Sequence, residues 1–181
     1  MAGRNEGKRF EDSFQNSVPE HVLVKRLNDN AAGWSGGANT RFTSTNEADF
    51  ICFDSIYRMF YAFELKSTQG TSFSFWREDF DVKGKKQSFM IKKNQILGLQ
   101  KWSKFPFVAC GFIFNFRDEG NYTFFVSIEN FLCYTKELEK KSVNLSDVIA
   151  MNGIEIESRL LKTNYRYDME KFLKEAKDKY V

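Results

Sequence analysis

The sequence predicts a single α/β domain, and three observations support that fold class. The 181 residues are enough for one domain with a substantial core and too few for two. Helical and strand-like apolar patterns alternate along the chain. The segment 105–116, "FPFVACGFIFNF", is apolar throughout and is best interpreted as a strand covered on both faces. We therefore expect a sheet packed against helices over residues 1–181, without an internal repeat or a second domain.

The first elements follow from local patterns. Apolar residues at fourfold spacing predict a helix over 5–17, with Glu11 at the edge of its packed face, where a charged side chain ordinarily reaches water. A strand is predicted at 22–27. Residues 28–46, "NDNAAGWSGGANTRFTSTN", are rich in Gly, Asn, Ser and Thr and predict a long loop. Loops of this length are uncommon in compact domains unless they are functional or disordered.

The rest of the chain continues the alternation of strands and helices. Its patterns predict strands at 49–53, 59–66, 72–76, 105–116, 122–128 and 154–157, and helices at 89–105, 129–140, 146–151 and from 168 onward. The helix at 89–105 should be the main one packed on the sheet.

The cysteine and histidine content excludes several kinds of site. The three cysteines are scattered and set mostly in apolar surroundings, so we expect core residues and neither a disulfide framework nor a zinc site. The single histidine, His21, excludes multi-histidine metal sites, and no GxSxG stretch accompanies it. A surface or strand-edge position is therefore favoured for His21. Catalysis in such a chain would depend on carboxylates and lysine.

Charge and hydropathy point to a soluble protein with a mild preference for polyanions. The formal net charge is +3, and the basic residues cluster near the start, at 83–86 and on the helix at 89–105. No apolar run approaches the ~20 residues of a membrane helix. The first ten residues lack the apolar core of a signal peptide. We expect a cytoplasmic protein without membrane contact.

The strand at 59–66 carries two charges on a face that should be covered. Side chains alternate along a strand, so Glu64 and Lys66 share a face with Phe60 and Ala62. Burying an unpaired carboxylate costs several kcal/mol or shifts its pKa. Two compensations are open: an ion pair between Glu64 and Lys66 alone, or a metal cation.

The preceding strand favours the metal. If residues 55–58 form a hairpin loop, Phe53 pairs with Phe60, and the same register sets Asp49 opposite Glu64. Neighbouring carboxylates repel one another unless a positive charge lies between them, and two carboxylates with water suit Mg²⁺. The competing interpretation is a hairpin end whose charges are merely solvated.

Asp49 followed by "ELK" at 64–66 resembles the core motif of the PD-(D/E)xK nuclease superfamily, with Ala48 in place of its proline. More specifically, the chain is similar to the RecU-type Holliday-junction resolvases, over nearly its whole length and in the same order. The similar segments are "RNEGKRFED", "TNEADF", "FELKST", "KKNQILGLQKW" and "NYRYDMEKFL". The resemblance implies a restriction-endonuclease-like core, in which a mixed central sheet is flanked by helices. Residues 28–46 take the place of the family's protruding stalk.

The resemblance also assigns roles to single residues. It implies that Asp49, Glu64 and the Leu65 carbonyl hold Mg²⁺, with Mn²⁺ as a substitute, and that Glu11 is a third acid near the metal. Lys66 would orient or deprotonate the attacking water. Gln95 would position that water or the scissile phosphate. No nucleotide cofactor is implied.

The implied partner is branched DNA, and the implied activity is the resolution of four-way junctions in recombination and repair by a homodimer with two sites. Composition low in Pro and rich in Phe, Lys and Asn suggests an AT-rich, phage-like source. The alternatives are a restriction-like or nicking nuclease and a non-catalytic DNA-binding module. The expected DNA contacts are Arg4, Lys8, Arg9, Trp34, Arg41, Lys83, Lys85, Lys86, Lys92 and Lys93.

Overall fold

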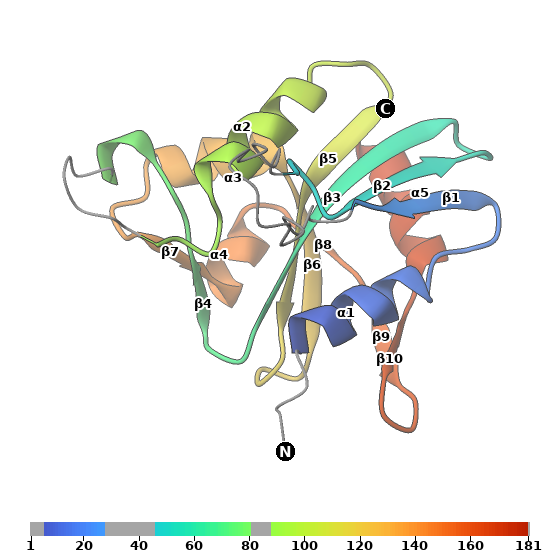
Figure 1. The fold of residues 1–181 in the computed structure, drawn as a ribbon. Coiled ribbons are helices and arrows are strands. Elements are labelled where there is room, and N and C mark those ends of the chain that lie inside the picture. Colours follow the sequence, from blue (N-terminus) through green and yellow to red (C-terminus); the bar gives the residue numbers. More distant parts are fainter. Residues whose placement is uncertain (1–5, 28–45, 81–87, 181) are drawn as a thin grey trace, which may run out of the picture.

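The computed structural model describes residues 6–27, 46–80 and 88–180, and its centre is a mixed six-stranded sheet (Figure 1). The strand order is β1-β2-β3-β5-β6-β8. β3 and β5 pair in parallel, and the other neighbours pair antiparallel. The strands are β1 (Val22–Arg26), β2 (Phe50–Asp54), β3 (Met59–Thr68), β5 (Val108–Phe116), β6 (Tyr122–Ser127) and β8 (Ile154–Glu155). The predicted α/β class and mixed sheet are confirmed.

Helices cover both faces of this sheet (Figure 1). One face packs against α1 (Glu6–Gln15) and α5 (Met169–Tyr180). The other packs against α2 (Lys93–Trp102), α3 (Ile128–Lys136) and α4 (Leu145–Ala150). The short elements are β4 (Ser72–Ser74), which pairs with β7 (Ser142–Asn144), the 3-10 turn η1 (Glu78–Phe80), and β9 (Ser158–Leu160), which pairs with β10 (Tyr165–Tyr167).

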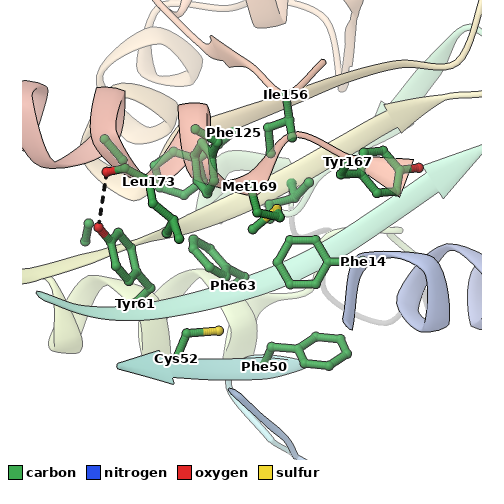
Figure 2. Close-up of a cluster of buried hydrophobic side chains, with 14 of the residues drawn as sticks. Phe14, Phe50, Cys52, Tyr61, Phe63, Phe125, Ile156, Tyr167, Met169 and Leu173 are labelled. Atoms are coloured by element: carbon green, nitrogen blue, oxygen red, sulfur yellow. Dashed lines mark hydrogen bonds between the residues drawn. The ribbon is translucent and has the colours of Figure 1, made fainter. Parts of the chain in front are cut away.

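The core on the α1 side is largely aromatic (Figure 2). Phe63 of β3 lies at its centre and has ring contacts with Phe14, Phe125 and Phe172 at centroid distances of 5.8, 5.5 and 5.8 Å. A second cluster fills the α2 side. β5 is therefore covered on both faces, as its apolar sequence predicts, although it begins at Val108 and not at residue 105.

Two sequence-based expectations need correction. α2 begins at Lys93 and not at 89, because Ile91 remains extended and bridges to Phe75 beside β4. Cys133 is exposed on α3 and is no core residue. Cys52 and Cys110 are buried as expected, and burial raises the pKa of both thiols to about 12.

Candidate functional site

The tight turn of the β2–β3 hairpin fixes the register of its strands. Asp54, the last residue of β2, is fully buried, and its Oδ1 accepts hydrogen bonds from the Ile56 and Tyr57 amides at 2.8 and 2.9 Å. Arg58 closes the turn with a φ of 56°. Phe53 consequently pairs with Phe60, as predicted from the four-residue loop.

Asp49 and Glu64 are neighbours at the other end of this hairpin. Phe50 pairs with Phe63, so the next step of the register sets Asp49 opposite Glu64. The Asp49 amide donates to the Phe63 carbonyl at 2.9 Å. The Asp49 Oδ2 in turn accepts a hydrogen bond from the Leu65 amide at 2.7 Å. The carboxylate of Asp49 thus lies against the strand segment that carries Glu64.

Glu64 is only 3% exposed and points to the α2 side of the sheet, where Ala62 also packs. Its Oε1 accepts hydrogen bonds from Lys66 Nζ, at 2.8 Å, and from Gln95 Nε2. The Gln95 amide is itself oriented, because its Oε1 accepts the Lys92 backbone N–H at 2.9 Å. The site therefore contains the Glu64–Lys66 ion pair that the sequence left as one of two possible compensations.

A glycine missed by the sequence-based prediction brings the segment before β2 against α2. A β-carbon at Gly98 would overlap the Glu47 side chain, so only glycine lets this segment approach so closely. Asn94 Nδ2 also donates to the Asn46 carbonyl at 3.5 Å. The signal in the sequence was a glycine inside an otherwise good helical pattern.

Glu11 reaches the same end of the hairpin from α1. Its carboxylate forms an ion pair with Arg26, at the end of β1. Burial raises the pKa of Glu11, the nearby Asp49 carboxylate raises it further, and Arg26 opposes both effects. The structure therefore brings Glu11 within electrostatic range of Asp49. The role of Arg26 could not be read from the sequence, because it depends on the placement of α1 beside β1.

Four of the basic residues expected to contact DNA lie in the described part of the chain. Lys92 and Lys93 are exposed at the start of α2, and Lys93 Nζ lies 4.6 Å from the centre of the Trp76 ring. Lys8 is exposed on α1, whereas Arg9 is held by Glu6, at 2.9 Å, and by the Thr163 carbonyl. The other expected contacts fall outside the described residues, namely Arg4, Trp34, Arg41, Lys83, Lys85 and Lys86.

His21 lies away from Glu11, Asp49 and Glu64, because it precedes β1 whereas Arg26, the partner of Glu11, ends that strand. Its two ring nitrogens are each 3.8 Å from a carboxylate oxygen, one of Asp54 and one of Glu170. In the described part of the chain, no three His, Cys, Asp or Glu side chains form a group that could hold a metal ion by themselves. None of the described helices is long and apolar enough to span a membrane.

Comparison with known proteins places the chain in a family. No protein-family model matches it. The chain is 32% identical over 184 residues to the SPbeta prophage-derived uncharacterized protein YotM of Bacillus subtilis (strain 168). It belongs to the family of that protein. The match covers 94% of this chain and 86% of the relative, so the family shares the domain as a whole and not a fragment of it.

Proposed function

We propose that this protein is a Mg²⁺-dependent DNA endonuclease with a restriction-endonuclease-like core, and that its substrate is the four-way DNA junction. The observation that carries the proposal is the buried Glu64, held by Lys66 and Gln95 in the centre of the sheet and set opposite Asp49. The strand does not need a charged residue here for its packing, since the residues that precede Glu64 on this face of β3, Phe60 and Ala62, are apolar and pack against the α2 side. A buried polar cluster of this kind is a candidate for chemistry.

The donor set suits a magnesium ion. Asp49 and Glu64 supply carboxylate oxygens from neighbouring strands, and the Leu65 carbonyl is the expected third ligand. Mg²⁺ typically uses one or two carboxylates and keeps several waters, so the absence of a three-acid group among the described residues is compatible with it. When bound, the ion would supply Lewis acidity and lower the pKa of water.

The remaining side chains have roles that follow from their positions. Lys66 is a point charge beside Glu64, suited to orient the attacking water and to stabilise negative charge on the phosphate. Gln95 is fixed by the start of α2 and can position a phosphate oxygen through its amide. Glu11 would be a third acid beside Asp49, and its pKa is raised by burial first and by the Asp49 carboxylate second.

An exposed apolar surface supports the homodimer in this proposal. Leu23, Phe53 and Phe60 are register neighbours across three strands, and Leu23 is 65% exposed on the edge strand. Phe107 lies beside them, since its carbonyl accepts the Phe60 amide at 2.9 Å, and it is 60% exposed. Exposed apolar patches of this kind mark interaction sites. A twofold pair of copies would bring two sites to the two strands of a junction.

The decisive experiment is cleavage of a labelled four-way junction in Mg²⁺ by the wild-type protein and by Glu64→Gln. The proposal predicts paired nicks by the wild type, none by the variant, and retained binding by both. Equal cutting of linear duplex would support a restriction-like nuclease instead. A wild-type protein that binds DNA without cutting any substrate would contradict the enzyme and support a non-catalytic DNA-binding module.

A further inference from the structure

β1 forms one edge of the six-stranded sheet (Figure 1). It pairs with β2 on one side, and in the part of the chain that the structure describes no strand pairs with its other side. The ladder with β2 is regular over the whole of β1, and the strand contains no proline. Such an edge presents a row of N–H and C=O groups that can pair with another strand.

The register with β2 shows which backbone groups of β1 point outward. The Leu27 N–H donates to the Asp49 carbonyl at 2.8 Å, and the Ser55 N–H donates to the His21 carbonyl at 3.2 Å. These two hydrogen-bonded pairs lie on either side of β1, and hydrogen-bonded pairs alternate with non-hydrogen-bonded pairs along an antiparallel ladder. The residues whose backbone groups point away from β2 are therefore Val22, Val24 and Arg26.

A second copy of β1 fits this edge when it runs antiparallel and the pairing is centred on Val24. Val24 then lies opposite Val24 of the second copy, and Arg26 lies opposite Val22, so outward groups meet outward groups along the whole strand. The N–H groups of Val24 and Arg26 in both copies find carbonyl acceptors. The Val22 N–H needs none, because it already donates to the Pro19 carbonyl at 3.0 Å.

The side chains favour the same centre. With the pairing centred on Val24, Lys25 lies opposite Leu23 of the second copy, so like charges do not meet. A pairing centred on Lys25 would set two lysines directly opposite one another, which is destabilising. A pairing centred on Leu23 would leave the Arg26 N–H beyond the end of the opposing strand and would form fewer hydrogen bonds.

The same pairing joins the exposed apolar surfaces of the two copies. Leu23 is 65% exposed, and its register neighbour Phe53 is 43% exposed. Across the paired edge, Leu23 of one copy lies diagonal to Leu23 of the other, a separation that long side chains can span. The methylene stem of Lys25 can cover the leucine that it lies opposite. The exposed apolar surface that begins at Leu23 therefore continues from one copy into the other.

We propose that two copies of the chain pair through β1 into one continuous sheet, with a twofold axis perpendicular to the sheet at Val24. This axis keeps the α2 sides of both sheets on the same side of the dimer, so both Glu64 side chains lie toward one common face. Asp49 lies opposite Leu27, three positions after Val24. With the ordinary rise and spacing of strands, the two Asp49 residues are roughly 25 Å apart. The inference rests on the proposed function for its two sites acting on one substrate.

The first test measures oligomeric mass by sedimentation equilibrium. Val24→Pro removes the N–H at the centre of the pairing, and an edge strand tolerates proline where that N–H points away from the sheet. Val24→Ala keeps the N–H and is the matched control. We expect dimers for the wild type and Val24→Ala, and a monomer with an unchanged circular dichroism spectrum for Val24→Pro. A monomeric wild type, or a Val24→Pro variant that stays dimeric, would overturn the proposal.

The second test fixes the register by disulfide cross-linking and does not depend on the proline variant. It uses a Cys133→Ser background, because Cys133 is exposed whereas Cys52 and Cys110 are buried. Val24→Cys should form an intermolecular disulfide, since residues opposite one another in a hydrogen-bonded pair have Cα atoms about 5.5 Å apart. Leu23→Cys is the matched control and should not cross-link, because its copies lie diagonal to one another. Cross-linking by Leu23→Cys and not by Val24→Cys would overturn the register, and cross-linking by neither would overturn the pairing.

DNA cleavage is a separate readout that distinguishes this inference from the proposed function. A Val24→Cys dimer that cross-links but cuts no DNA would overturn only the proposed function. A wild type that is monomeric and cuts junctions would overturn only the pairing through β1.

Discussion

Two buried acids with lysine partners, Asp147 and Glu64, differ in what the fold requires of them. Asp147 lies in the first turn of α4 and closes a capping box with Asn144, whose amide it accepts at 2.7 Å. It also accepts hydrogen bonds from Tyr134, at 2.9 Å, and from Lys140, at 2.5 Å. The geometry of a helix start explains a carboxylate at that position.

Glu64 has similar partners in a different place. It accepts hydrogen bonds from Lys66 and Gln95, but it lies within β3, between β2 and β5 in the sheet, and it follows the apolar Phe60 and Ala62 on the same face. Strand geometry does not call for a charge there. Burial and a lysine partner therefore do not by themselves indicate a functional site, since Asp147 has both and serves as a helix cap. Glu64 is a candidate site residue because no capping or turn geometry explains a buried carboxylate at its position.

Removing the charge of Glu64 should therefore reduce DNA cleavage, whereas removing the charge of Asp147 should leave it unchanged. Glu64→Gln keeps the size of the side chain and an oxygen that can accept both hydrogen bonds. We expect its junction cleavage to fall by at least about 10²-fold, measured in single-turnover assays, because an electrostatic group at the reacting centre is lost. Asp147→Asn should cleave near the wild-type rate. Comparable losses of cleavage in Glu64→Gln and Asp147→Asn would contradict the assignment of Glu64, and not Asp147, to the active site.

Removing the lysine beside Glu64 should give the largest loss of stability. Lys66→Met leaves the buried carboxylate without its ion pair, which typically costs about 3–5 kcal/mol in the free energy of unfolding. Urea denaturation measures this change. The double variant Glu64→Gln/Lys66→Met should recover most of it, because no charge is then left buried. A double variant no more stable than Lys66→Met would show that the loss arises from packing.

The capping acid should give a smaller, pH-dependent loss. Asp147→Ala is expected to cost about 1–2 kcal/mol at neutral pH, as other N-terminal cap removals do. Burial alone would raise the pKa of Asp147, but the hydrogen bonds from Lys140, Asn144 and Tyr134 hold it below its ordinary value of 3.8. Ionised Asp147 therefore stabilises the fold above about pH 4, and that contribution disappears as the pH falls through the lowered pKa. A stability difference from wild type that is constant between pH 7 and 2.5 would contradict this.

Glu11 should show the smallest effect and the opposite sign. Burial and Asp49 raise its pKa above 4.5, so its protonated form is favoured by folding. The contribution to stability is fully present below pH 4.5 and is lost as the pH rises through the raised pKa. Compared with wild type, Glu11→Gln should gain relative stability from pH 4 to pH 7 in thermal unfolding. A flat difference over this range would show that burial and Asp49 together do not raise the pKa of Glu11.

Much of this arrangement could be predicted from the sequence. The hairpin register followed from strand alternation and loop length: Phe53 pairs with Phe60 as predicted, and the ladder runs to Phe50 and Phe63, the residues next to Asp49 and Glu64. Strands apolar on both faces predicted the centre of the sheet, because only covered strands tolerate such composition.

Other features were beyond the sequence because they depend on contacts between distant elements. The β9–β10 hairpin has short strands without an alternating apolar pattern, and two arginines fasten it to α1 and its end across about 150 residues of chain. Likewise, the pairing of Glu11 with Arg26 exists only once α1 packs beside β1. The predicted loop at 28–46 lies outside the described residues, apart from Asn46.

The most direct test of the central claim is Mn²⁺ binding, followed by the loss of the free-ion signal in electron paramagnetic resonance. The wild type should bind Mn²⁺, Glu64→Gln and Asp49→Asn should lose that binding, and Asp147→Asn should retain it. Binding by Glu64→Gln that equals the wild type, or a wild type that binds no Mn²⁺, would contradict the assignment of Asp49 and Glu64 as a metal site.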